Sequence, residues 1–315
     1  MHPLVSHYRQ IINAKIPAGS VVTRHNEKGH FYEVVPLQVV LPSVTGKIQI
    51  VKDESLGNFR MNQAIEYFFA HFKELTDANI MEFCERAAEV SIQKRDDAGD
   101  IGTRIHDYRQ RYFDDWIREG RRPENILSYL PPEEVDLRAT SGLRALDKFI
   151  NEKDYIPVAC ELFVYDAGHK LALNVAGTLD DIGLMRRVIR PGDANCGPNG
   201  HSVLGGLDKK YRCVRCEYKY TYDLVLMDIK TSNQFKDHYF FQVALYYQFF
   251  KNLTGLKPRR CFILKLSKED GTYKLEDLRQ LGKLIKYARH MVMTDQGVDF
   301  IKSLRKDNQK TLISL

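Results

Sequence analysis

Three short runs near the start of the chain are rich in β-branched and aromatic residues and are separated by turn residues, a pattern typical of β-strands. These runs cover residues 21–23, 31–35 and 37–41. We therefore expect the first stretch of the chain, to about residue 50, to consist of short strands.

From about residue 57 the apolar residues recur at every third or fourth position, which is the spacing of an amphipathic helix. Ile65, Phe68 and Phe72 follow this spacing, and the pattern continues to about residue 93. The polar run Asp96–Asp100 contains a glycine and is expected to break the helix. A new helix is then expected to begin at Gly102.

The second half of the chain alternates between apolar runs and turn residues, which predicts a sheet followed by a packed helix. This order is typical of an α+β fold with a central mixed, mostly antiparallel sheet flanked by helices. The expected strands are 158–166, 170–175, 177–185, 224–230 and 260–266, the expected helices are 102–117, 141–150, 235–253, 275–291 and 299–305, and turns are expected at 166–169 and 271–272.

Composition narrows the class of protein without identifying it. The 315 residues are 43% hydrophobic and 28% charged, a globular mix that excludes collagen-like, disordered and membrane-embedded proteins. We find no uncharged apolar run long enough to span a membrane, and the N-terminus lacks the apolar core of a signal peptide. We therefore expect an intracellular, cytoplasmic protein (in the host cell if viral) with no membrane partner.

Carboxylates recur within or at the ends of the apolar strands, at Glu161, Asp180 and Asp228. Residues two apart on a strand point to the same face, so Asp228 and Lys230 should emerge together while Ile229 points into the core. Acids on three consecutive strands suggest a shared site for Mg²⁺ or Mn²⁺, which prefer oxygen ligands. The alternative is a set of solvated edge acids with a surface ion pair.

Five short motifs follow one another along the chain in a recognisable order. They are Leu41-Pro42-Ser43-Val44-Thr45, Gly102-Thr103-x-x-His106, Gly177-Thr178-x-Asp180, Asp228-x-Lys230-Thr231-Ser232 and Gln242-x-x-x-Tyr246. Together they resemble the PD-(D/E)xK nuclease superfamily, in particular its RecB-like and Cas4-like exonucleases, a branch that includes phage and mitochondrial genome-maintenance members. The resemblance spans roughly residues 40 to 265 and depends on the order of the motifs, because none of them is specific by itself.

The resemblance implies an α/β/α restriction-endonuclease-like core and a set of metal ligands. Asp180 and Asp228 match the metal-binding acids of the family, and Ile229 would lend its main-chain carbonyl to the same Mg²⁺ or Mn²⁺. Glu161 matches an acid that many members hold near that metal. His106 matches a histidine beside the metal or the scissile phosphate, although a histidine taken alone is more often a buried or capping residue.

The resemblance also implies roles for the residues around the metal. Lys230 matches the catalytic lysine. Gln242 and Tyr246 lie one helical turn apart on one face and would help to order the active site and the DNA; core packing is the alternative. Thr231 and Ser232 could bind a phosphate oxygen, and they equally suit the turn that ends a strand.

The implied function is that of a metal-dependent DNA exonuclease. It would hydrolyse phosphodiester bonds from ends, on single-stranded DNA or duplex ends, in recombination, repair or replication, with a helicase or recombinase as a candidate partner. Two alternatives stay open: a non-catalytic nucleic-acid-binding protein on the same fold, and a restriction-type endonuclease.

A long basic segment, residues 186–222, separates Asp180 from Asp228. It contains eight Lys or Arg and three Asp or Glu, so it holds a surplus of five of the +6 charges of the whole chain. Its tyrosines, interleaved with basic residues, suit single-stranded nucleic acid, and a solubilising hairpin is the alternative. The domain division that follows is an N-terminal strand and helical region (1–95), a nuclease core (96–185 and 223–315) and this insert.

Four residues of the insert are candidate ligands of a structural zinc ion, namely Cys196, His201, Cys213 and Cys216. The alternative is a loop with reduced thiols. An iron–sulfur cluster is not expected, because the Cas4-like relatives place a cysteine cluster after the core, whereas here only Cys261 follows the lysine motif.

A zinc site formed by these residues predicts that the purified protein contains zinc. The Cys213→Ser variant should contain less, because removing one thiolate from a tetrahedral site lowers its affinity for zinc. Elemental analysis of both proteins measures this. An equal zinc content in the two proteins would remove Cys213 from the ligand set.

Overall fold

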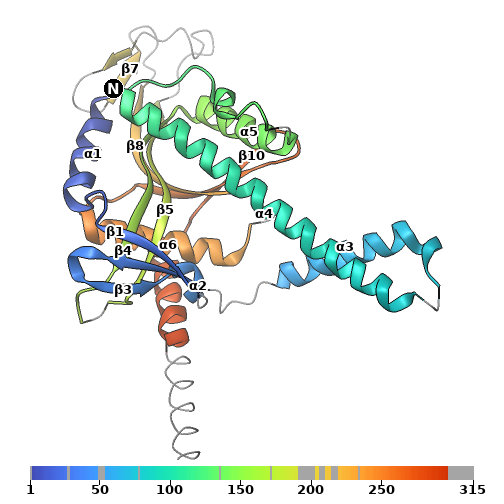
Figure 1. Ribbon diagram of the computed structural model, residues 1–315. Coiled ribbons are helices and arrows are strands. Elements are labelled where there is room, and N and C mark those ends of the chain that lie inside the picture. The colour runs from blue at the N-terminus through green and yellow to red at the C-terminus, as the bar shows by residue number, and fades with distance from the viewer. Residues whose placement is uncertain are drawn as a thin grey trace, which may run out of the picture.

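A mixed, mostly antiparallel sheet forms the centre of the protein (Figure 1). The computed structural model describes residues 2–26, 29–48, 54–76, 79–134, 136–170, 172–190, 203–205, 210–213, 219–232 and 235–296. The strands are β1 (Val21–Asn26), β2 (Gly29–Val34), β3 (Val39–Pro42), β4 (Tyr155–Asp166), β5 (Val175–Arg190), β6 (Val203–Gly205), β7 (Lys210–Cys213), β8 (Lys219–Lys230), β9 (Arg260–Leu266) and β10 (Tyr273–Asp277).

The central sheet has the strand order β10-β9-β8-β5-β4, and β7 pairs with both β6 and β8. The β8–β9 pair is parallel, and the other pairs of this sheet are antiparallel. The sequence-based prediction of an α+β fold with a mixed, mostly antiparallel sheet flanked by helices is confirmed.

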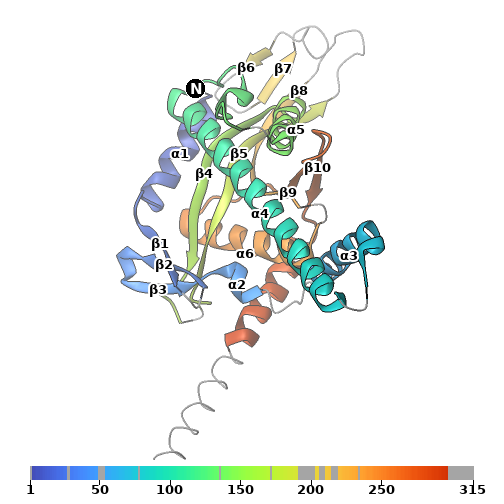
Figure 2. The ribbon, with the colours of Figure 1, turned by 45° about the vertical axis from the view of Figure 1, so that its right-hand side comes forward.

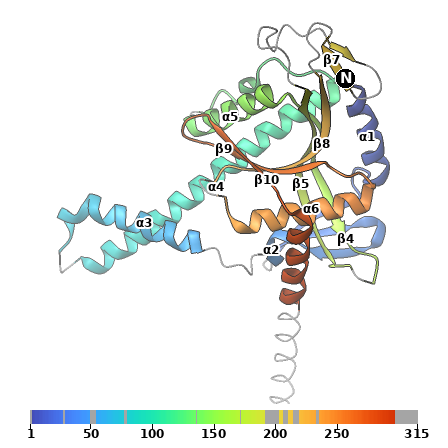
Figure 3. The ribbon, with the colours of Figure 1, turned by 180° about the vertical axis from the view of Figure 1, so that it is seen from behind.

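Helices cover both faces of this sheet (Figures 1 and 3). One face packs against α4 and α5, and the other packs against α1, α2, α6 and a helix over 281–296. The helices are α1 (Pro3–Lys15), α2 (Val44–Ile48), α3 (Glu54–His71), α4 (Ile80–Glu119), α5 (Leu137–Lys153) and α6 (Asp237–Thr254), with short 3₁₀ turns η1 (Val35–Leu37), η2 (Phe72–Glu74) and η3 (Ile126–Tyr129).

The expectation that the first stretch of the chain consists of strands is wrong at both of its ends. The strands β1, β2 and β3 do form a small antiparallel sheet, but α1 precedes it and α2 follows it. The helix α1 buries Leu4, Val5 and Ile12 against the central sheet, which is tertiary packing that short-range patterns do not reveal.

The expected helix break at Asp96–Asp100 is also wrong. The helix α4 runs without interruption through these residues, and the expected domain boundary between residues 95 and 96 falls inside it. The side chains of Asp96, Asp97 and Asp100 are at least partly exposed, so they need no partners, and a helical glycine costs only about 1 kcal/mol. Burial of Ile101 and Ile105 just beyond outweighs that cost.

The helix α3 and the first half of α4 form a hairpin that projects away from the sheet (Figures 1 and 2). Several of its hydrophobic side chains are exposed, among them Phe69 at 75% and Met81 at 71%. None of the helices in the described ranges is both long enough and apolar enough to cross a membrane.

Further boundaries differ from the sequence-based expectation. The strand β5 continues to Arg190 and β8 begins at Lys219, so both extend into the expected insert over 186–222. The described residues between 170 and 174 are not a strand, because β5 begins at Val175 after the turn at Gly168, whose φ is 83°. The expected helix over 275–291 begins later, because β10 occupies Tyr273–Asp277. The expected helix over 299–305 lies outside the described residues.

Close packing of Gly183 against Tyr155 generates a stability prediction. A Cβ at Gly183 would overlap the tyrosine ring, so Gly183→Ala should lower the free energy of unfolding by about 1–3 kcal/mol. Gly99 in α4 is the matched control: an added methyl there would meet no atom within 4 Å, so Gly99→Ala should raise stability by about 0.5–1 kcal/mol. Urea unfolding measures both, and equal effects of the same sign would contradict this packing.

Candidate active site

The candidate site forms where two central strands separate. The strands β5 and β8 pair from Arg190 and Lys219 as far as Asp181 and Met227, and their pairing ends there. At the next position Asp180 Oδ2 accepts a hydrogen bond of 2.6 Å from the main-chain N–H of Ile229. A carboxylate therefore replaces the main-chain partner at the point where the ladder stops.

Glu161 lies opposite Asp180 on the neighbouring strand. Cys160 pairs with Asp181 and Leu162 pairs with Leu179, so Glu161 and Asp180 face each other between these pairs. The φ of Glu161 is 45°, a left-handed conformation that is costly for a residue with a side chain. The surrounding strands hold this conformation at the candidate site.

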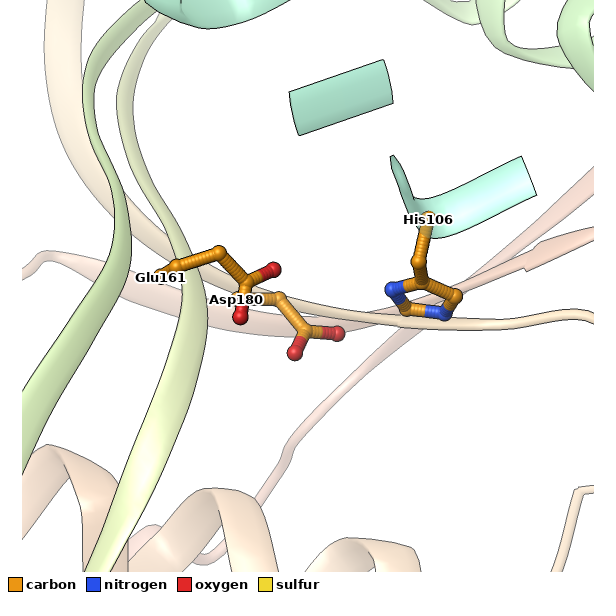
Figure 4. A group of neighbouring side chains, drawn as sticks. All are labelled: His106, Glu161 and Asp180. Carbon is orange, nitrogen blue, oxygen red and sulfur yellow. The ribbon is translucent and has the colours of Figure 1, made fainter. Parts of the chain in front are cut away.

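His106 reaches the same place from α4, a helix far from β4 and β5 in sequence (Figure 4). The ligand atoms of His106, Glu161 and Asp180 all lie within 4.8 Å of one another. The structure thus brings together three of the residues that the sequence proposed as metal ligands.

Asp228 and Lys230 form an ion pair beside this group. Lys230 Nζ lies 2.8 Å from Asp228 Oδ2 and 5.1 Å from the centre of the Tyr239 ring. Asp228 and Ile229 are completely buried, and Ile229 lies in the core as the strand alternation predicted. Asp228 is not one of the three residues within 4.8 Å, so its place as a metal ligand stays a prediction.

Burial and neighbouring charges act differently on the three acids of the proposed site. Burial raises the pKa of Asp228 to about 7 and that of Glu161 to about 7, against the opposing effects of Lys230 and Arg109. Burial acts on Asp180 in the same sense, but Lys230, His106, Arg109 and the N–H of Ile229 together bring its pKa below the usual range. Asp180 is therefore the carboxylate most readily ionised.

His106 and Lys230 are shifted in opposite directions. Burial lowers the pKa of His106 to about 4, although Asp180 partly offsets it, so the ring is neutral at physiological pH. Burial would lower the pKa of Lys230, but Asp228 and Asp180 raise it above its usual value. The site thus combines a neutral imidazole, which can bind a metal, with a permanent cation.

Sequence reasoning missed two charged residues beneath this site. Arg109 and Asp181 are completely buried, and Arg109 Nη1 lies 2.7 Å from Asp181 Oδ2. Arg109 Nη2 also donates a hydrogen bond to Glu161 Oε1. The available signal was the position of Arg109 on the apolar face of α4, three residues after His106.

Gln242 and Tyr246 lie close to the site but do not touch the three clustered ligands in the contacts described. Gln242 Nε2 donates to Tyr246 Oη at 2.9 Å and to Thr45 Oγ1 at 3.2 Å. A Cβ at Gly177 would lie 2.5 Å from the Tyr246 ring, which explains the glycine. This pair joins α6, α2 and β5, so it supports the packing beside the site.

The turn after Lys230 packs against the start of the histidine motif. A Cβ at Gly102 would lie 2.7 Å from Thr231 Oγ1, so the glycine allows α4 to approach the end of β8. Tyr239 Oη donates to Ser232 Oγ at 3.3 Å. Both hydroxyls therefore have contacts within the protein, and phosphate binding by Thr231 or Ser232 stays a prediction.

The residues present fit a divalent cation. Neither buried oxygen of Asp228 has a well-formed hydrogen bond among the described residues, apart from the ion pair with Lys230. The acids formally outnumber the cations by two, and burial raises the pKa of Glu161, Asp181 and Asp228, so either protons or a divalent ion can offset this excess. The acids are Glu161, Asp180, Asp181 and Asp228, and the cations are Arg109 and Lys230. The carboxylates suit Mg²⁺ or Mn²⁺, which prefer oxygen ligands.

The proposed zinc ligands cannot be placed in the same way. Cys196, His201 and Cys216 lie outside the described residues. Cys213 ends β7, and its side chain is not described.

Comparisons with known proteins add little to this geometry. No protein-family model matches the chain, and no curated protein matches it. Among the solved structures that match is one titled "Crystal structure of SSO0001", at 14% identity and a TM-score of 0.24, covering 61% of this chain and 74% of that one. A likeness at this level carries no argument about fold or function.

The shifted pKa of His106 predicts how acid affects the metal-free protein. Below pH 6.5 the unfolded histidine binds a proton, whereas the folded one does so only near pH 4. Keeping His106 neutral therefore costs nothing above pH 6.5. As the pH falls from 6.5 to about 4, the free energy of unfolding decreases by up to about 3 kcal/mol, because only the unfolded chain gains the proton.

Urea unfolding in EDTA between pH 7 and pH 4 measures this loss. His106→Gln keeps a neutral polar side chain without the titration, so its stability should fall less steeply. Identical pH dependence in the two proteins would show that His106 is not held neutral.

Proposed function

We propose that the chain is a metal-dependent DNA exonuclease with an α/β/α restriction-endonuclease-like core of the PD-(D/E)xK type. The observation that carries the proposal is the meeting of His106, Glu161 and Asp180 beside the Asp228–Lys230 pair, where β5 and β8 separate. Elements distant in sequence supply these groups, and the sequence alone singles out each of the five residues.

The chemistry of these groups supports hydrolysis of a phosphodiester. A divalent cation bound by the acids and His106 would polarise the phosphate and lower the pKa of an attacking water. Lys230 is kept protonated by Asp228 and Asp180, which favours orienting the water or offsetting developing negative charge over accepting a proton. Neutral His106 can act as a ligand or as a donor to the scissile phosphate.

The choice of DNA as substrate comes from the resemblance of the motifs to the RecB-like and Cas4-like exonucleases. The basic surplus of residues 186–222 agrees with a polyanionic partner. We further propose action from DNA ends, preference for single strands, a role in recombination, repair or replication, and loading by a helicase or recombinase. Mg²⁺ or Mn²⁺ is the proposed cofactor.

The proposal predicts that Lys230→Met lowers the rate of DNA degradation by at least about 100-fold, because a charge aimed at the transition state is lost. End-labelled linear DNA, single- and double-stranded, is incubated with Mg²⁺ or Mn²⁺ and the products are resolved by size. Lys47→Met is the matched control, since Lys47 also forms a 2.8 Å ion pair, with Asp295. It should leave the rate unchanged.

The same assay separates the alternatives. Equal degradation by the wild type and Lys230→Met would refute the catalytic role of the lysine. Cleavage of closed circular DNA would identify a restriction-type endonuclease. If the wild type binds DNA but does not cleave it with either metal, the alternative of a non-catalytic nucleic-acid-binding protein is supported.

A further inference from the structure

The buried Arg109 links two acids that lie on adjacent strands. Its side chain is 1% exposed, and its guanidinium contacts Asp181 through Nη1 and Glu161 through Nη2. Nη1 also lies 3.3 Å from the main-chain oxygen of Asp180. One side chain from α4 thus holds β4 and β5 together directly beneath the three clustered ligands.

Asp181 is suited to anchor this arginine. It follows Asp180 on β5, and its carboxylate lies 2.7 Å from Nη1 of Arg109 on α4. Its carboxylate is completely buried and contacts Arg109, while neither of its oxygens has another partner among the described residues. Arg109 thus contacts Asp181 through Nη1 and Glu161 through Nη2.

The contact with Glu161 is more than a simple neutralisation of charge. Arg109 holds Oε1 of Glu161, and the backbone of Glu161 is in the left-handed conformation at that point. A carboxylate held at one oxygen keeps its second oxygen for another partner. A guanidinium can hold two carboxylates in one plane, whereas the single nitrogen of a lysine cannot.

We infer that Arg109, oriented by Asp181, is a positioning residue that holds the Glu161 carboxylate as a ligand in the candidate metal site. This inference rests on the proposed function, because it concerns the same divalent cation. Groups that orient metal ligands typically change metal affinity about 10- to 100-fold when they are removed.

A purely structural role makes a different prediction. Replacing a buried ion pair by apolar residues of similar volume is often neutral or stabilising. Arg109→Met with Asp181→Leu would then leave metal binding unchanged. A positioning role instead predicts a folded protein that binds the metal more weakly, since Glu161 has lost its support.

Mn²⁺ binding to the full-length protein, measured by the EPR signal of free Mn²⁺, tests the inference without any DNA. R109M/D181L should bind Mn²⁺ about 10- to 100-fold more weakly, while its thermal unfolding in EDTA shows that it is folded. Arg109→Lys keeps the charge and serves if the double variant fails to fold; it should also weaken binding, because it cannot reach both acids. R122M/D147L removes a 2.6 Å ion pair elsewhere on the protein and should bind like the wild type.

Adding Glu161→Gln distinguishes positioning from a general loss of structure. Glu161→Gln alone should weaken Mn²⁺ binding, but in the R109M/D181L background it should cost little more, because both changes act through one carboxylate. Wild-type affinity in R109M/D181L and in Arg109→Lys, or fully additive losses with Glu161→Gln, would overturn the inference and leave the metal site standing. Absence of Mn²⁺ binding by the wild type would overturn the proposed metal site together with the inference.

Discussion

The hydrogen bond from the Ile229 N–H to the Asp180 carboxylate is the interaction on which the candidate site depends. It is made where the β5–β8 ladder ends, so that a side chain takes over the pairing of a buried main-chain donor. A buried N–H without a partner would cost about 1–3 kcal/mol, which ties the position of Asp180 to the integrity of the sheet. Glu161 and His106 meet Asp180 just beyond the end of this ladder.

Charge balance is the second constraint on this region. Four acids lie close to one another with Arg109 and Lys230, and burial would make each unpaired charge costly. The pKa values of Glu161 and Asp228, both raised to about 7, show how burial disfavours their ionised forms. Protons or a divalent cation can relieve the same excess, and this is the physical link between the electrostatics of the sheet and the proposed chemistry.

The strands and packed helices of the second half of the chain were largely predictable, because apolar runs bounded by turn residues are local signals. The end of β8 at Lys230 and the helix α6 occur close to where the pattern placed them, and Ile229 points into the core as alternation required. The helix α1 and the continuous α4 were not predictable in this way. Their formation depends on burial against elements distant in sequence, which outweighs local propensity.

The sequence by itself determined which residue types stand at the ends of which strands. The order of the motifs was sufficient to select His106, Asp180, Asp228 and Lys230. The acid within the preceding apolar strand added Glu161. Only the tertiary structure decided that His106, Glu161 and Asp180 converge within 4.8 Å while Asp228 pairs with Lys230. Only the fold, likewise, placed Arg109 between two strands. The physical reason is that strand alternation assigns a side chain to a face, whereas the separation of β5 from β8 and the path of α4 across the sheet set its distance to the others.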